Sequence, residues 1–191
     1  MLLQKLVGSL GLVLVMNVNA GRAEEASFRF RDTGNYIQEE TLIDANGDGK
    51  TADLALMAGQ SEQLGQTTTH SVLEWSSLFT PATCPNGKPG LQENLVGGNA
   101  LTYLTDGDLL LIRFKQGSRC VDPATHAANV TLTGTIVGGT GQFAKAIGNV
   151  EVVSMTIPEI VIDEAGVFLS GSIDSEMTGR ITTPADRKRS S

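Results

Sequence analysis

The sequence predicts an all-β protein, a single antiparallel β-barrel of about eight strands. Apolar and polar residues alternate along several stretches, and no long stretch of the mature chain repeats apolar residues at helical spacing. Glycine-containing turn pairs separate these stretches at short intervals. Closing such a sheet into a barrel removes exposed strand edges, so we expect a barrel, with a two-sheet sandwich as the alternative.

The first 23 residues are predicted to be a secretory signal peptide. Lys5 supplies a basic start, an apolar stretch follows from Leu6 to Val18, and cleavage is expected after Ala20 or Ala23. The apolar stretch is shorter than the about 20 residues of a membrane-spanning helix. We therefore expect no membrane span and a secreted or periplasmic mature protein.

Three segments follow from this reading: a signal peptide at 1–23, a barrel domain at 24–183 and a polar basic tail at 184–191. A mature chain of about 170 residues fits one domain. The formal net charge of the full chain is −7, and an acidic surface repels phosphate. The charge therefore argues against nucleic acid as a partner, and the sequence indicates no oligomeric state.

The two cysteines, Cys84 and Cys120, are predicted to form a disulfide. An exported chain meets an oxidising environment, where an even pair of cysteines usually closes a bridge. Neither cysteine has a nearby histidine or a C-x-x-C partner, which argues against a metal-binding or catalytic thiol.

Alternation is clearest in two stretches near the end of the chain. Threonines alternate with apolar residues from Val130 to Ile136, and a longer alternating run extends from Val167 to Ile181. Gly171 and Gly179 fall on the apolar face of the longer run, where glycines often mark bends in a curling sheet. With turns expected at Asp106-Gly107 and elsewhere, we count about eight to ten strands.

The most distinctive segment of the chain is glycine-rich. Gly139, Gly141 and Ala144 match the G-x-G-x-x-A pattern of dinucleotide-binding loops, but that pattern requires a long helix after it. Gly148 ends any helix within a turn and a half. A structural interpretation therefore fits better: the glycines permit positive φ and a tight reversal, and one helical turn places Phe143 and Ala146 under the sheet.

This segment, G-G-T-G-Q-F-A-K-A-I-G, resembles the strand-turn-strand signature of allene oxide cyclase-like and dirigent-like proteins. The resemblance implies an eight-stranded antiparallel barrel with a lumen open to small apolar ligands. Dirigent proteins are taken to orient radical intermediates of phenolics, and allene oxide cyclases to isomerise a fatty-acid epoxide. No catalytic residue of either activity can be placed on this chain. The motif residues are Gly138, Gly139, Thr140, Gly141, Phe143, Ala146 and Gly148.

A second candidate site resembles the first half of a calcium-binding loop. Oxygen-bearing side chains stand two residues apart and are followed by Gly49, as in D-x-[DN]-x-[DN]-G. The twelfth position is Ala55 instead of a bidentate glutamate, which leaves a plain polar turn as the alternative. The candidate ligands for Ca²⁺, the one cofactor that the sequence suggests, are Asp44, Asn46, Asp48, Lys50 through its carbonyl, and Asp53.

Three functions stay open at this stage. The leading hypothesis is an exported, non-catalytic barrel that binds a small apolar or phenolic molecule, because no catalytic set is recognisable. His70 and His126 have no spacing signature, and Trp75 is expected in the core or at the rim. The alternatives are a cyclase or isomerase that acts in the lumen by holding a reactive conformer, and a calcium-stiffened surface or matrix module.

Overall fold

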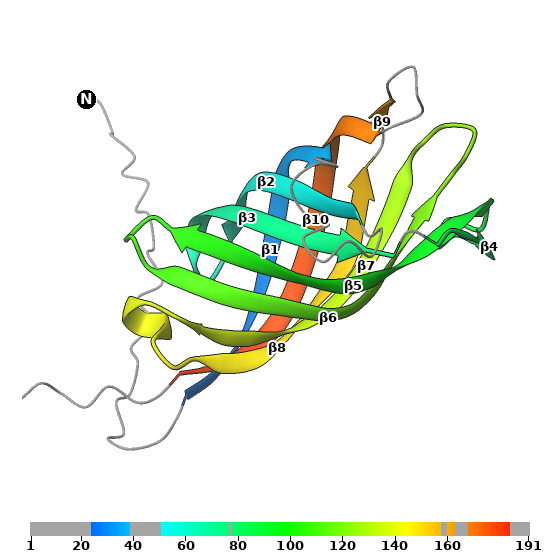
Figure 1. The fold of residues 1–191 in the computed structure, drawn as a ribbon. Helices are drawn as coiled ribbons and strands as arrows, with labels where there is room; N and C mark the ends of the chain where they lie inside the picture. The colour runs from blue at the N-terminus through cyan, green and yellow to red at the C-terminus, as the bar shows by residue number, and fades with distance from the viewer. Residues whose placement is uncertain (1–23, 39–50, 77, 158–159, 163–167, 184–191) are drawn as a thin grey trace, which may run out of the picture.

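The computed structural model describes residues 24–38, 51–76, 78–157, 160–162 and 168–183, which are nearly all β-strand (Figure 1). One 3-10 helix, η1, spans Gly141–Phe143. Within the described ranges no helix is long and apolar enough to cross a membrane. The strands are β1 Glu24–Gln38, β2 Thr51–Ser61, β3 Gly65–Trp75, β4 Thr80–Thr83, β5 Pro89–Leu104, β6 Leu109–Val121, β7 Ala128–Gly139, β8 Ile147–Ile157, β9 Ile160–Ile162 and β10 Phe168–Thr183.

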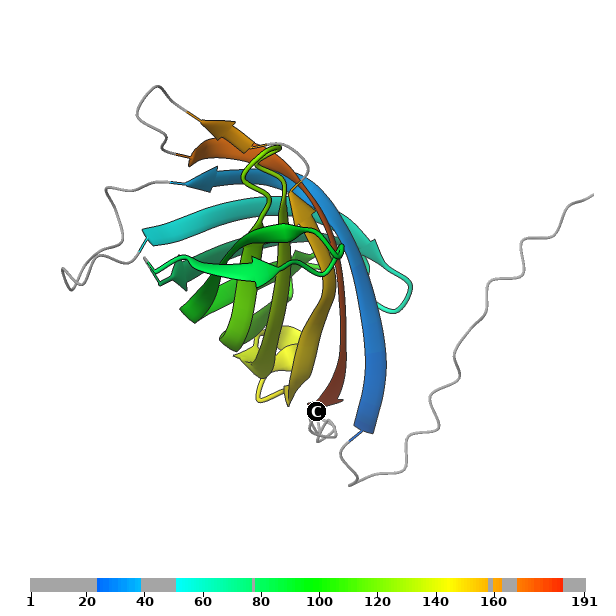
Figure 2. The same ribbon diagram turned by 90° about the vertical axis from the view of Figure 1, so that its right-hand side faces the viewer.

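Eight of these strands form a closed antiparallel barrel. Their order is β1-β2-β3-β5-β6-β7-β8-β10, and β1 also pairs with β10 from Glu24 opposite Thr183 to Ile37 opposite Ser170. Figure 2 shows these first and last strands running side by side. The short strands β4 and β9 lie outside the ring and pair with β5 and β10. The predicted barrel is confirmed, and the sandwich alternative is wrong.

One end of the barrel is closed by the glycine-rich segment, as the sequence predicts. Phe143 and Ala146 are buried with 2% and 0% of their surface exposed. Gly138 and Gly141 have φ values of 134° and 50°, which favour glycine. Gly139 serves a different purpose, because a Cβ at this position would overlap the carbonyl oxygen of Leu109.

Polar contacts fasten this plug to the β5–β6 hairpin. The Leu109 amide donates to Thr140 Oγ1, and the Thr140 amide donates to the Leu109 carbonyl, both over 2.9 Å. The Gln142 amide donates to the Asp108 carboxylate over 2.9 Å. The hairpin turn therefore holds η1 over the end of the barrel, which we call the plug end.

The opposite end, which we call the Trp75 end, carries an arm braced by a disulfide. β4 pairs with the start of β5, and together they project beyond the ring (Figure 1). Cys84 follows β4 and forms a disulfide with Cys120 in β6, as predicted. A Cβ at Gly90 would overlap the Cys84 sulfur, so this glycine lets the disulfide lie against β5.

Candidate functional site

A buried ion pair lies inside the barrel at the Trp75 end. Glu93 in β5 and Arg119 in β6 are direct cross-strand neighbours. Arg119 Nε donates a hydrogen bond of 2.5 Å to Glu93 Oε1, and Arg119 Nη2 lies 2.5 Å from the same oxygen as an ion pair. The side chains are 1% and 2% exposed, so water screens this pair far less than a surface pair.

Trp75 completes this cluster, which we call the Trp75 site. The Arg119 Cζ atom lies 5.0 Å from the centroid of the Trp75 ring, within the range of a cation–π contact. Trp75 is 1% exposed, and its indole N–H meets no acceptor among the described residues. Farther along the inner face of β3, the Ser71 hydroxyl is also buried without a partner there. Buried polar atoms seldom stay unsatisfied in proteins, and those that do can mark a bound molecule.

The middle of the lumen is packed with side chains. Phe30, Leu132 and Val152 face inward from the middle of three strands, and they are 0%, 1% and 4% exposed. Residues lining an open lumen would present accessible surface to it. Nearer the plug end, Thr69 and Thr102, which are direct neighbours on β3 and β5, also share a buried hydrogen bond of 3.0 Å. The lumen implied by the resemblance is thus filled at this level, which confines any ligand to an end of the barrel.

A second buried carboxylate lies nearer the plug end. Asp32 in β1 is 2% exposed and accepts a hydrogen bond of 3.3 Å from Thr67 Oγ1. Burial raises the pKa of Asp32, and the Thr67 hydrogen bond opposes that rise in part. Gly59, its partner in β2, leaves room for the carboxylate, because a Cβ there would overlap Asp32 Oδ1.

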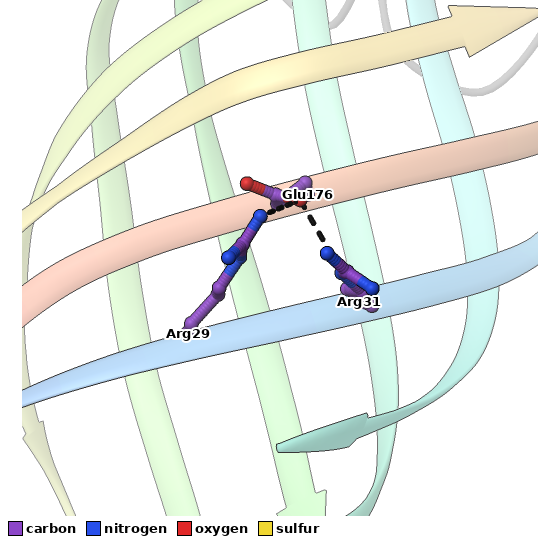
Figure 3. A network of polar contacts seen from close by, with 3 residues as sticks. All are labelled: Arg29, Arg31 and Glu176. Carbon is purple, nitrogen blue, oxygen red and sulfur yellow. Dashed lines mark hydrogen bonds and ion pairs between the residues drawn. The ribbon is translucent and has the colours of Figure 1, made fainter. Parts of the chain in front are cut away.

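The outer face of β1 and β10 carries an exposed charge network (Figure 3). Glu176 Oε2 accepts from Arg29 Nη2 at 2.5 Å and from Arg31 Nε at 3.4 Å. The Arg29 hydrogen bond holds the pKa of Glu176 below its usual range, and the same bond raises the pKa of Arg29. The two arginines are 51% and 70% exposed, so the network contributes little to stability.

The predicted calcium ligands lie mostly outside the described residues. Four of them lie outside the described residues: Asp44, Asn46, Asp48 and Lys50. The fifth, Asp53, is described only as a backbone position in β2. In the part of the chain that the structure describes, no group of three or more His, Cys, Asp or Glu side chains could hold a metal ion. Calcium binding by the Asp44 loop stays a prediction.

The histidines lie away from the Trp75 site. His70 is exposed on the outer face of β3, where its ring lies 5.3 Å from that of Tyr103. His126 belongs to the turn between β6 and β7 and has a φ of 58°. Trp75 lies in the core, which is one of the two expected places. Glu93 and Arg119 were not predicted as a site.

Comparisons with known proteins add a single likeness. No family model matches the chain, and no curated protein matches it. Among solved structures, that of a pterocarpan synthase dirigent protein is similar over 87% of this chain and 88% of the other, with 10% sequence identity and a TM-score of 0.31. A likeness of this degree is consistent with the barrel established by the strand pairing and carries no argument about activity.

Proposed function

We propose that this protein is an exported, non-catalytic barrel that binds a small, largely apolar molecule carrying a carbonyl or phenolic oxygen at the Trp75 site. The observation that carries the proposal is the buried indole N–H of Trp75, which meets no acceptor among the described residues. A ligand oxygen would accept this hydrogen bond. Export is supported by the predicted signal peptide and by the Cys84–Cys120 disulfide.

The chemistry of the site favours binding over catalysis. Glu93, the acid of this site, accepts a hydrogen bond from Arg119 and forms an ion pair with it through the same oxygen. A carboxylate held in this way is a weak general base, because the guanidinium stabilises its charged form. The Arg119 guanidinium and the indole N–H would instead offer polar contacts to one end of an apolar ligand.

Access to the site requires side chains to move apart, since Trp75 is 1% exposed. We therefore expect slow association, because binding coupled to a conformational change has a reduced association rate. The Cys84–Cys120 disulfide restrains this end of the barrel, so its reduction should make opening easier and speed association of the ligand.

Trp75 is the only tryptophan of the chain, so its fluorescence reports on this site directly. The test is a fluorescence titration of the disulfide-bonded mature protein with 4-propylphenol, with propylbenzene as the control that lacks the oxygen. We expect a saturable change in emission with 4-propylphenol and a weaker one with propylbenzene. Equal responses, or none, would contradict the proposal.

The packed middle of the lumen favours a second candidate function, a surface module without an internal ligand. Its stiffness would come from the Asp44 loop if that loop binds calcium, as the sequence predicts. A chelator should then lower the melting temperature of the purified protein, and Asp48→Ala should abolish the difference. An unchanged melting curve in both experiments would reject the calcium loop.

A further inference from the structure

The outer face of the β5–β6 hairpin carries a compact group of apolar side chains. Leu101 and Leu111 are direct cross-strand neighbours, and so are Tyr103 and Leu109 in the next outward-facing row. The four side chains are exposed or half-buried, with 40% of Tyr103 and 36% of Leu111 open to solvent. We call these two rows the apolar square.

The square belongs to an apolar side of the barrel wall. Val72 in β3 and Val137 in β7, which are 37% and 47% exposed, extend the apolar surface to the strands on either side of the hairpin. The outer face of β1 and β10 instead carries charged side chains, among them Arg29, Arg31 and Glu176 (Figure 3). Exposed apolar side chains gathered on one face and rimmed by polar residues often mark a protein–protein contact.

Opposite charges stand at the two ends of the square. Arg113 and Lys115 follow it along β6, and both are exposed. Asp106 and Asp108 lie at the other end, in the turn between β5 and β6. Among the residues that the structure describes, neither of the two bases forms an ion pair. The hairpin therefore presents an acidic end, an apolar centre and a basic end in one line.

Two further charges lie at the margins of this face. Glu74 in β3 is placed opposite Gly97 of β5, toward the basic end. Lys145 lies between η1 and β8, toward the acidic end. Each is a single charge beside two of the opposite sign, so the ends keep their net signs.

The acids of the hairpin turn are held in place by the plug. Asp106 Oδ1 accepts a hydrogen bond of 3.0 Å from the Asp108 amide, and Asp106 Oδ2 accepts one of 3.3 Å from Gln142 Nε2. Asp108 Oδ2 accepts one of 2.9 Å from the Gln142 amide. An ionised carboxylate has about four acceptor sites, so both acids keep sites for a basic partner. Because they are already ordered, pairing them costs little further side-chain entropy.

We propose that this face binds a second copy of the chain, with the two hairpins packed face to face and antiparallel. Along β6, Asp108 stands directly before Leu109, at one edge of the square. Arg113 stands two residues after Leu111, at the other edge. A two-fold axis in the plane of contact, between the two rows of the square, therefore lays each acidic end on the basic end of the other copy and one apolar square on the other.

A second copy satisfies all three parts of the face at once. A two-fold contact uses the same surface on both partners, so that surface must be complementary to itself. A polyanion would match the basic end alone, a polycation the acidic end alone, and a small apolar molecule only the centre. The face lies on the outer wall of the barrel, so the proposal does not depend on the Trp75 site.

The size of the face sets the expected affinity. It extends about 23 Å from Asp108 to Lys115 at about 3.3 Å per residue, and the four strands β3, β5, β6 and β7 make it about 19 Å wide at 4.8 Å per strand. Standard interfaces bury about 800 Å² per partner, and contacts at the small end of the range are weak. We expect a dimer in equilibrium with monomer, with a Kd of about 10–100 µM.

The first test is sedimentation velocity of the disulfide-bonded mature protein from about 1 to about 500 µM, a range that brackets this Kd. We expect the sedimentation coefficient to rise with concentration from that of a monomer to that of a dimer. A monomer throughout the range, or a complex of three or more copies, would overturn the proposal.

Two exposed aliphatic residues supply a variant and its control. Leu111→Lys places a charge at the centre of the contact and should weaken dimerisation at least about tenfold. Val153→Lys changes a side chain that is 45% exposed on β8, away from the hairpin, and should dimerise like the parent. Both variants should keep the parent melting temperature at concentrations where the parent is monomeric. Unchanged dimerisation of Leu111→Lys would contradict the proposed face.

A charge exchange tests the antiparallel arrangement. Lys115→Glu gives both ends a net negative charge, and Asp106→Lys gives both a net positive charge. Each variant alone should dimerise at least about tenfold more weakly than the parent, because like charges then face each other. An equal mixture of the two should dimerise again, since each end then meets its opposite. A misfolded variant could not be rescued in this way, and a mixture that stays monomeric would refute the arrangement.

Discussion

Replacing Glu93 by glutamine tests the buried ion pair that anchors the Trp75 end. The change keeps the shape of the side chain and removes its charge. Arg119 then stays buried, 2% exposed, without the carboxylate with which it now forms an ion pair and a hydrogen bond. The change leaves the atoms of the Arg119–Trp75 contact in place.

The expected loss is large because both partners lie out of water. Removing one member of a buried pair costs about 3–5 kcal/mol. For a domain of this size, each kcal/mol lowers the melting temperature by about 2–4 °C, so we expect a fall of about 6–20 °C. Replacing both residues by apolar ones of similar volume should cost much less than the two single changes together.

Urea unfolding followed by circular dichroism measures these differences. Glu25→Gln is the control, since Glu25 lies 3.7 Å from Arg180 with both side chains exposed, and its loss should leave stability unchanged. A loss below about 1 kcal/mol for Glu93→Gln, or strict additivity in the double variant, would refute the assignment of a buried, coupled pair.

Three further perturbations test the barrel itself. Replacing Cys84 and Cys120 by serine should lower the free energy of unfolding by about 4 kcal/mol, because the disulfide closes a loop between residues 36 positions apart. A reducing agent should have no further effect on this variant. Asp32→Asn should stabilise the protein at pH 7, because burial raises the pKa of Asp32 in the folded state. The parent protein therefore loses stability as the pH rises from the unfolded pKa of Asp32 through its folded pKa. Melting curves measured across this pH range should show the loss in the parent and not in the variant. Gly179→Ala should cost about 1–3 kcal/mol in urea unfolding because its Cβ would lie 2.6 Å from Phe28 Cζ, whereas Gly97→Ala, with nothing within 4 Å, should be tolerated.

The sequence predicts most of the barrel because alternation persists where a strand is buried on one face. Along β7, Val130, Leu132 and Ile136 are buried while the threonines between them are exposed or half-buried. The first half of β1 was not predicted. The inward-facing positions of β1 begin with Phe28 and Phe30 and continue with Asp32 and Gly34. The alternation of apolar and polar residues therefore stops after two apolar positions.

The Trp75 site was out of reach for a related reason. The alternation pattern assigns charged residues to the outer face of a strand. Glu93 and Arg119 face inward instead, and both are buried. A register shift between Phe114 and Gln116 also changes which face Arg119 occupies relative to the start of β6. One signal was present in the sequence: Arg119 stands two residues before the apolar Val121, so in a strand the two side chains share a face.

Native mass spectrometry of the mature protein, purified from its own host without chelator, decides whether Trp75 lies at a ligand site. We predict an excess mass that matches one small organic molecule, absent from a Trp75→Phe variant that keeps the parent fold. A bare protein mass, or the same excess in the variant, would contradict a ligand site at Trp75.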